Sequence, residues 1–485
     1  MSKINTSIIL LLMISLSLDA TVRIKRVIKG NMTLVYKASP PKVNNFLDMF
    51  SRGIMYGRFR TNSFINKPQV QTQERRSTWT TGIGGSIIYK TAYFKGFGAT
   101  AGLYTSQNPW HINQSEVKYL KGDRGTLSRY DAATSGNFNM TVLAQAYIQY
   151  KQFKSDIKIG RQIFESRLTA SDDTKMIPNT FEGISYIGKY FSKTTIKLAY
   201  FTRQKLRDHT TFHDVLAYDD SNKAAYSQWT QNDDAGMPHG LTTAKLAQKG
   251  IKTRLIIAQI NNKSIRNLRL MFNYTSVPKL VSSITLDAYY KIYLPDSFAV
   301  IPGFRYMQQF DEGAGVIGGA NLKDDSTGYT NKASVDGKLY GARLDLRHGG
   351  FLGRLGYTYI ANEADIIAPW RGYPTGGFTR NMAQYNWYAN TASYMLRLGY
   401  NFKQIGINTF ARYVVQDFDN NKPGTPADHN AIEWDLTKTF ASVPDLYLKL
   451  RMEYISYKSG TRDMLGNIKS APSFGDYRFG INYLF

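Results

Sequence analysis

Histidine is the scarcest chemically versatile residue in this 485-residue chain, and cysteine is absent. His209 and His213 have the i, i+4 spacing that can place two zinc ligands on one helix face, but no Glu-x-x intervenes as a zinc-protease motif requires. The other histidines also fall in segments predicted to be loops or turns, so no hydrolase triad is evident. Without cysteine there is no disulfide, thiolate metal site or cysteine nucleophile. The sequence therefore predicts a protein that is not an enzyme, with no cofactor and no metal site. The six histidines are His111, His209, His213, His239, His348 and His429.

Basic residues are the more informative group, because 61 Lys and Arg outnumber 36 Asp and Glu and give a formal net charge of +25. Many arginines occupy the polar positions of segments in which every second residue is apolar. A guanidinium can grip a carboxylate with two parallel hydrogen bonds, so a row of arginines could pass an anion along. Acids at similar positions, or lipopolysaccharide phosphates, could instead pair with individual arginines. The basic candidates are Arg58, Arg60, Arg269, Arg343, Arg347, Arg354, Arg397, Arg412 and Arg451, and Arg478 shares the pattern.

The alternation that positions these arginines predicts β-strands. In residues 476–485, Tyr477, Phe479, Ile481 and Phe485 fall on one face of a strand, and Arg478 falls on the other. Side chains of a strand alternate between faces, so such a strand has one apolar and one polar side. Segments 140–151, 268–274, 284–291, 340–347, 394–402 and 446–454 repeat this pattern. The C-terminal Phe is similar to the sorting signal of Gram-negative outer-membrane barrels.

A soluble β-sandwich has alternating strands too, but its strands are usually shorter than these, which run to ten residues or more. Each apolar face is about one bilayer tall, as a transmembrane barrel requires. The basic residues spread over such strands, which argues against nucleic-acid binding. The sequence therefore predicts an all-β transmembrane antiparallel barrel.

Connection lengths predict about eighteen strands, with short periplasmic turns and long extracellular loops. Residues 299–310 are assigned to a loop so that the number of strands is even, and residues 249–251 to a short turn. Short links are predicted near 93–96, 152–153, 191–194, 249–251, 348–350, 403–404 and 442–445, and long ones near 106–139, 162–180, 203–239, 294–337, 360–391, 415–430 and 457–475.

The first fifty residues are expected to precede the barrel domain. Lys3 precedes an apolar run from 8 to 18 that is too short to cross a bilayer and is typical of a signal peptide, assigned to residues 1–20. Residues 21–50 are assigned to a periplasmic N-terminal segment, which either extends into the periplasm or plugs part of the lumen. Residues 51–485 are assigned to the barrel.

One further motif lies in residues 160–183: residues 160–162 read Gly-Arg-Gln, residues 168–175 are predicted to form an acidic turn, and residues 177–183 read Ile-Pro-Asn-Thr-Phe-Glu-Gly. This motif resembles the third loop of the OprD family of outer-membrane porins. The family pattern is a Gly-Arg-Gln strand end, an Asp-Ser-Arg-like turn and Leu-Pro-x-Thr-Phe-x-Gly. Weaker similarity extends over most of residues 50–485, including residues 56–60, 433–435 and 448–451.

The resemblance implies an eighteen-stranded barrel whose third loop folds inward and narrows the pore. It places Ser171, Asp172, Asp173, Lys175 and Glu182 at this constriction and adds Arg161 to the basic ladder that faces it. Lys175 stands where the family often has Arg, and Asp172 where Asn is common.

The function expected is passive or facilitated diffusion of small anionic, carboxylate-bearing or zwitterionic solutes through the outer membrane of a Gram-negative bacterium. The alternative is a surface adhesin or structural barrel whose loops bind partners. The other expected partners are outer-membrane lipid and lipopolysaccharide, and a homotrimer is considered beside a monomer.

Overall fold

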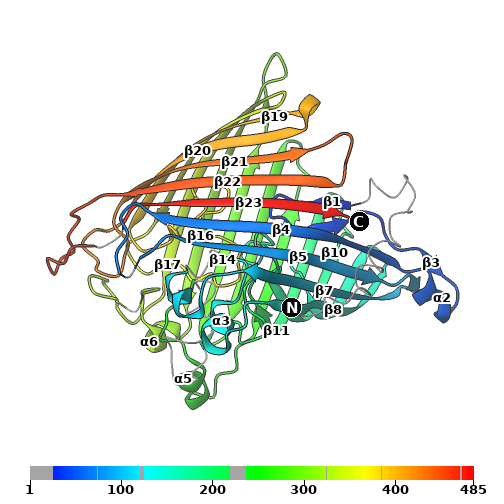
Figure 1. Cartoon of the computed structure of the whole chain (residues 1–485), viewed down its shortest axis with the longest axis horizontal. Helices are drawn as coiled ribbons and strands as arrows, with labels where there is room; N and C mark the ends of the chain where they lie inside the picture. The colour runs from blue at the N-terminus through cyan, green and yellow to red at the C-terminus, as the bar shows by residue number, and fades with distance from the viewer. Residues whose placement is uncertain are drawn as a thin grey trace.

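The computed structural model describes residues 26–73, 75–120, 125–218, 236–323, 325–383, 385–469 and 472–485; the expected signal peptide, residues 1–20, lies outside them. Eighteen long antiparallel strands form one closed barrel (Figure 1). The last strand pairs with the first one, with Phe479 opposite Ser63. The strands are β4 (Ile54–Pro68), β5 (Thr78–Lys90), β7 (Phe97–Trp110), β8 (Met140–Gln152), β9 (Ser155–Gln162), β10 (Thr180–Gly188), β11 (Thr194–Lys205), β12 (Leu255–Asn262), β13 (Leu268–Val277), β14 (Val281–Tyr290), β16 (Ala299–Asp311), β17 (Gly337–His348), β18 (Phe351–Ile360), β19 (Thr391–Phe402), β20 (Ile407–Asp417), β21 (His429–Thr439), β22 (Leu446–Tyr457) and β23 (Phe474–Leu484).

The two faces of the strands differ as the alternation predicts. On β23, Tyr477, Phe479 and Ile481 are 37–43% exposed on the outside of the barrel, whereas Arg478 and Asn482 point inward and are at most 8% exposed. The outer surface is therefore apolar and the interior polar. The predicted fold class, an all-β antiparallel barrel of about eighteen strands, is confirmed.

The assignment of residues 299–310 to a loop was wrong. These residues form most of β16, which pairs with β14 and β17. The predicted turn at 249–251 was also wrong, because it follows the short helix α5 (Thr243–Gln248) inside the long connection 206–254. The two errors cancel in the strand count. Pro302, which has no N–H to donate, lies in β16 where the ladder to β14 ends at Gly303 and the ladder to β15 (Ile292–Tyr293) begins at Val300.

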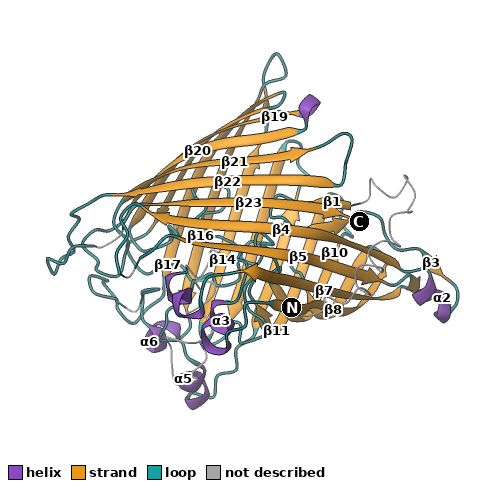
Figure 2. Ribbon diagram, viewed as in Figure 1, coloured by secondary structure: helices purple, strands orange, loops and turns teal. Residues whose placement is uncertain are grey.

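The two ends of the barrel carry different connections. Helices α3 (Arg129–Ser135), α5 and α6 (Ala314–Gly318) gather with the long loops at one end, and α2 (Phe46–Ser51) lies with β3 (Lys42–Val43), β6 (Tyr93–Phe94) and the C-terminus at the other (Figures 1 and 2). The 3₁₀ helices η3 (Gln114–Tyr119) and η5 (Lys403–Ile405) complete the helical elements of the described residues. None of the described helices is long and apolar enough to cross a membrane.

The segment assigned to a periplasmic extension divides into two parts. Residues 42–51 stay at the short-turn rim, where β3 pairs in parallel with β6. Residues 26–36 fold back into the barrel as a hairpin of β1 (Arg26–Ile28) and β2 (Leu34–Tyr36), with Val27 opposite Val35. We call residues 26–36 the N-terminal hairpin.

Several long loops pack on one another at the far end, and Asp365 joins two of them, 312–336 and 361–390. Its carboxylate is 1% exposed and accepts hydrogen bonds from the backbone N–H of Leu322 (2.9 Å) and of Ala389 (2.7 Å) and from the Tyr329 hydroxyl (2.6 Å). Burial raises the pKa of Asp365 to about 6 although these donors favour the charged form. One buried side chain thus fastens segments that are far apart in the sequence.

Replacing this acid should loosen the loop end without harming the strands. In Asp365→Ala, three buried donors lose their acceptor, at a cost of about 1–3 kcal/mol for each donor left unsatisfied. Limited proteolysis of the folded protein should then cut within the loops faster than in the wild type. Glu363→Ala is the matched control, because Glu363 makes only a part-exposed ion pair with Lys338. Equal cleavage of the two variants would contradict this role of Asp365.

Candidate functional site

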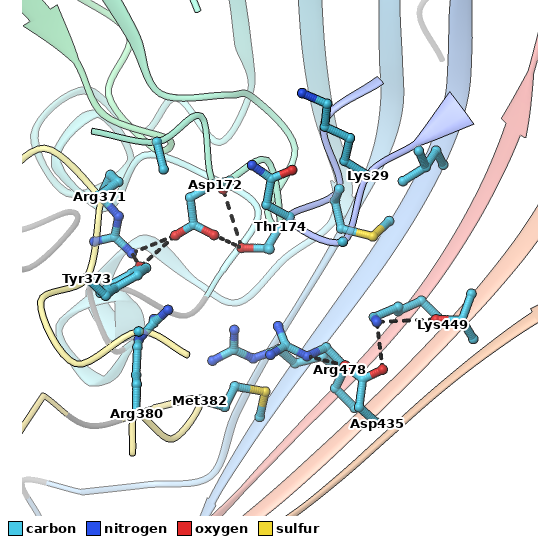
Figure 3. Close-up of a pocket in the computed structure, with 18 of the residues that line it drawn as sticks. Lys29, Asp172, Thr174, Arg371, Tyr373, Arg380, Met382, Asp435, Lys449 and Arg478 are labelled. Atoms are coloured by element: carbon cyan, nitrogen blue, oxygen red, sulfur yellow. Dashed lines mark hydrogen bonds and ion pairs between the residues drawn. The ribbon is translucent and has the colours of Figure 1, made fainter. Parts of the chain in front are cut away.

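A cavity of about 680 Å³ lies inside the barrel (Figure 3). Its walls come from the strands β19 to β23, from two loops that fold inward, from the start of the connection after β11 and from the N-terminal hairpin. We call residues 163–179, between β9 and β10, the first inward loop, and residues 361–390, between β18 and β19, the second inward loop. Ten cationic side chains and two carboxylates line the cavity; the cations are Lys29, Arg167, Arg207, Arg371, Arg380, Arg397, Arg412, Lys449, Arg451 and Arg478, and the acids are Asp172 and Asp435.

The first inward loop is held to the barrel wall by Asp173. Arg58 and Arg60 are inward residues of β4, and both bind its carboxylate, Arg60 at 2.8 Å. Arg60 also donates to the Asp173 backbone carbonyl at 2.9 Å. All three residues are at most 2% exposed. The sequence predicted that Arg58 and Arg60 belong to the basic side of the pore. In the structure, both arginines bind Asp173 and so fasten the first inward loop to the wall.

Asp172, the next residue, faces the cavity and binds one arginine of the second inward loop and one of the connection that follows β11. Its carboxylate is 3.0 Å from Arg207 and 3.2 Å from Arg371, and it accepts a 2.6 Å hydrogen bond from the Tyr373 hydroxyl (Figure 3). Burial alone would raise the pKa of Asp172, but these two arginines outweigh burial and hold it well below its ordinary value. The carboxylate is therefore ionised and is surrounded by positive charge.

The glycines that flank the first inward loop explain part of its sequence motif. Gly160 on β9 pairs with Gly183 on β10, and both have positive φ, 125° and 152°. A Cβ on Gly183 would lie 2.2 Å from the Tyr200 carbonyl oxygen, and one on Gly160 2.3 Å from the Ala146 carbonyl oxygen. Neither position can hold a side chain, because the neighbouring backbone occupies that space.

Backbone hydrogen bonds join the two inward loops. The Ala170 N–H donates to the Trp370 carbonyl at 3.0 Å, and the Gly372 N–H donates to the Leu168 carbonyl at 2.9 Å. The second inward loop is in turn clamped by wall arginines. Arg305 donates to the Pro374 carbonyl at 2.6 Å, and Arg343 and Arg354 both donate to the Gly377 carbonyl at 3.0 Å.

A row of inward arginines follows neighbouring strands. Arg354, Arg397 and Arg412 are directly paired across β18, β19 and β20, and Arg451 is paired with Arg478 across β22 and β23. Between the two groups, β21 contributes Glu433, which Arg412 binds through two bonds of 2.7–2.8 Å. The sequence alternation therefore places these side chains on one face, as predicted.

The carboxylates of this wall organise the arginines without cancelling their charge. Asp345 alone receives Arg354 at 2.6 Å, Arg347 at 3.6 Å and Arg343 at 3.7 Å. Asp435 receives Lys449 at 2.7 Å and Arg451 at 3.1 Å. Each of these acids has more cationic partners than it can neutralise, so the wall keeps a positive charge.

Two cavity arginines have no carboxylate within ion-pair distance among the described residues. Arg397 lies over the Phe410 ring, with its guanidinium carbon 3.8 Å from the ring centroid. Arg380 lies over the Tyr373 ring. Both side chains line the cavity. A guanidinium that rests on an aromatic face keeps its in-plane N–H donors free for an incoming anion.

The residues named from the sequence take different places. Of the expected constriction residues, Asp172 lines the cavity, whereas Ser171, Asp173, Lys175 and Glu182 do not. Lys175 forms a buried 2.8 Å pair with Asp208, and Glu182 lies 3.4 Å from Arg161. Of the expected basic ladder, Arg397, Arg412 and Arg451 line the cavity; Arg58, Arg60, Arg161, Arg269, Arg343, Arg347 and Arg354 do not.

Sequence reasoning found Asp172 but missed four other cavity residues that come from loops. Arg207, Arg371, Arg380 and Tyr373 lie in connections without any strand period, so no alternation marks them as inward. For residues 21–50 the sequence left open a periplasmic extension or a plug of the lumen, and it did not indicate the N-terminal hairpin. For Arg371 and Arg380, the only available signal was the composition of their segment, since cationic and aromatic residues recur between Trp370 and Tyr388.

No protein-family model matches the sequence, and no curated protein matches it. Solved structures match its fold. They include OpdK of Pseudomonas aeruginosa crystallised with vanillate (13% identity, TM-score 0.67, 90% of this chain and 99% of that chain). OccAB3 of Acinetobacter baumannii (14%, 0.68, 90% and 100%) and OccK9, or OpdG, of Pseudomonas aeruginosa (14%, 0.67, 90% and 99%) are also similar. OpdK is an outer membrane protein. The expected resemblance in fold to the OprD family is thereby confirmed.

The anchor at Asp173 should be among the strongest single contributions to the site. Asp173→Ala leaves Arg58 and Arg60 buried without their carboxylate, and breaking a buried ion pair costs about 3–5 kcal/mol. The temperature at which the folded, compact form is lost on an electrophoresis gel should fall clearly. In Glu182→Ala, which removes a part-exposed pair, the expected loss is below about 1 kcal/mol. A similar fall in both variants would contradict the anchoring role.

Proposed function

We propose that this chain, which has the barrel fold of the OprD and Occ channels, is itself an outer-membrane channel for small carboxylate-bearing solutes. Its long loops would face the exterior and its short turns the periplasm, as in other barrels of this kind. The apolar outer face of the strands supports a lipid environment, because a closed barrel satisfies all of its ladder hydrogen bonds internally. The proposed activity is transport alone, with no chemical reaction.

The observation that carries this proposal is the excess of positive charge in the cavity. Ten cations face two acids there, and Arg397 and Arg380 have no carboxylate partner among the described residues. Charges along a wall of low dielectric add their fields, so an anion is concentrated and a cation is repelled. Passage also requires that each contact be weak enough to release the solute, which a series of similar arginines provides.

The shape of the cavity supports a small solute with an apolar body. Its volume of about 680 Å³ lies within the usual range of small-molecule sites. Phe410 and Tyr373 line the cavity beside the two arginines without carboxylate partners. A solute could therefore bind a guanidinium through its carboxylate while its apolar part lies on an aromatic ring. The similar OpdK was crystallised with vanillate, a small carboxylate. For this chain, benzoate is a suitable test solute.

Recording single channels in planar bilayers tests the proposal. In a KCl gradient, the refolded protein should show discrete conductance steps with a reversal potential that reports preference for chloride. Replacing chloride with benzoate should reduce the current in a concentration-dependent way, because benzoate occupies the arginine row longer. Steps with cation preference would contradict the charge argument. A folded protein without conductance would favour the alternative of a surface-binding barrel.

The two arginines without carboxylate partners should account for a measurable share of the selectivity. Arg397→Ala combined with Arg380→Ala removes two cavity charges. The ratio of anion to cation permeability should fall by roughly five-fold or more, since a single charge contributes about 1 kcal/mol at high dielectric. Arg266→Ala is the matched control, because Arg266 is an exposed arginine in the short turn 263–267, outside the cavity. Equal effects of the double variant and the control would contradict the assignment.

A further inference from the structure

The N-terminal hairpin lies inside the barrel and supplies one wall of the cavity. Its turn, residues 28–32, lines the cavity together with both inward loops and the arginine row. Met32 also lies in a smaller adjoining space with Arg60, Lys449 and Arg478. In Figure 3, Lys29 lies on the side of the cavity opposite Arg371 and Arg380. The hairpin therefore reaches the level of the first inward loop from the short-turn end.

Specific contacts fix the hairpin in this position. Met32, Thr33 and Leu34 are 4–8% exposed. Arg58 donates to the Met32 carbonyl at 2.7 Å, and the same side chain binds Asp173 of the first inward loop. One wall arginine thus ties the hairpin and the loop together.

The tip of the hairpin also bonds directly to the first inward loop. The Asn31 amide donates to the Glu165 carboxylate at 2.7 Å and to the Ser171 hydroxyl at 3.1 Å, and the Thr33 and Ser171 hydroxyls are in hydrogen-bond contact. At its base, Arg26 pairs with Asp445 of the short turn between β21 and β22 at 3.3 Å. Leu34 and Tyr36 pack with Tyr56 in the apolar cluster above the rim.

The residues at the tip differ from those that hold it. Lys29 keeps 51% of its side chain exposed, and its ammonium lies 3.8 Å from Glu165. Gly30 has no atom within 4 Å of the position of a Cβ. The tip thus presents a cation and open space to the cavity, while the flanking residues are buried.

We propose that the N-terminal hairpin is a third wall of the constriction, which limits the width of the pore and makes Lys29 a specificity-determining contact for a passing carboxylate. This inference rests on the proposed channel function. It gives Ser171, which does not line the cavity, a definite part in the site: Ser171 positions the hairpin tip. It also places a lysine opposite the arginines of the second inward loop, so that a solute meets positive charge on both sides.

A cysteine cross-link tests the position of the hairpin independently of conduction. The chain has no cysteine, so Thr33→Cys with Ser171→Cys introduces the only two thiols. Because Thr33 and Ser171 are at most 4% exposed, the maleimide reagent is added after the protein is unfolded. Mild oxidation of the folded double variant should then protect both thiols, and reduction before labelling should restore their reactivity. The two single variants are the controls for accessibility. Two thiols that stay reactive after oxidation would overturn the proposal.

Single-channel recording then tests the function of the wall. Deletion of residues 26–36 should raise the conductance by roughly two-fold or more, because one side of the constriction is removed. The oxidised cross-linked variant should conduct like the wild type. An unchanged conductance after the deletion would overturn the proposal, even if the cross-link forms.

The charge of the tip is tested by Lys29→Ala. The ratio of anion to cation permeability should fall by about two-fold, since a half-exposed charge near the path contributes below about 1 kcal/mol. Lys37→Ala is the matched control, because Lys37 follows β2, is exposed and does not line the cavity. If Lys29→Ala and Lys37→Ala behave alike, Lys29 has no such role.

The outcomes separate this inference from the proposed function. Conduction with anion preference but no cross-link would overturn the hairpin wall and leave the channel intact. A cross-linked protein that conducts in none of its variants would overturn the channel and, with it, the pore role of the hairpin.

Discussion

The closure of the sheet on itself is the constraint on which the other features depend. Only when β23 pairs with β4 does every strand have two neighbours, so that no row of N–H and C=O groups is left at an edge. The last residue completes this seam: the Phe485 carbonyl accepts from the Gly57 N–H at 2.9 Å, the Phe485 N–H donates to the Gly57 carbonyl at 3.1 Å, and its ring contacts Phe59. Because the sheet is closed, one face of each strand points to a common interior.

Within this interior, buried carboxylates hold the arginine side chains in place. Asp173 fixes the first inward loop, Asp172 joins the two loops, and Asp345 and Asp435 orient arginines and lysines of the wall. Burial of an ion costs free energy unless partners compensate for the lost water, and here each acid is compensated several times. The surplus cations are the groups that remain for a solute. The same interactions therefore give both the rigidity and the charge of the site.

The sequence predicted the strands well because alternation of side chains is a local property that closure preserves. It failed at β16 because the false turn at 249–251 added a strand, and residues 299–310 were then assigned to a loop to keep the strand number even. Pro302 is tolerated in β16 because it lies between two ladders. The motif around Asp172 and Asp173 indicated the inward loop, but their partners Arg371 and Arg58 are some two hundred and one hundred residues distant in sequence. No periodicity reports such contacts. The second inward loop and residues 26–36 reach the site because they fold into the barrel interior. Whether a connection folds inward is decided by the closed barrel and not by a local sequence pattern.

The seam between β4 and β23 also constrains the order in which the chain can assemble. Ser63 and Phe479 are separated by nearly the whole barrel sequence, so their pairing has the largest entropic cost of loop closure and belongs to the end of folding. Residues 26–36 precede β4, with β3 and α2 between them, and must cross into the interior beside this seam. A hairpin that enters before the seam closes is enclosed by it, whereas one that enters later must thread through the short-turn mouth. The time at which the N-terminal residues enter the interior, before or after the seam closes, is therefore a step in the assembly of the barrel.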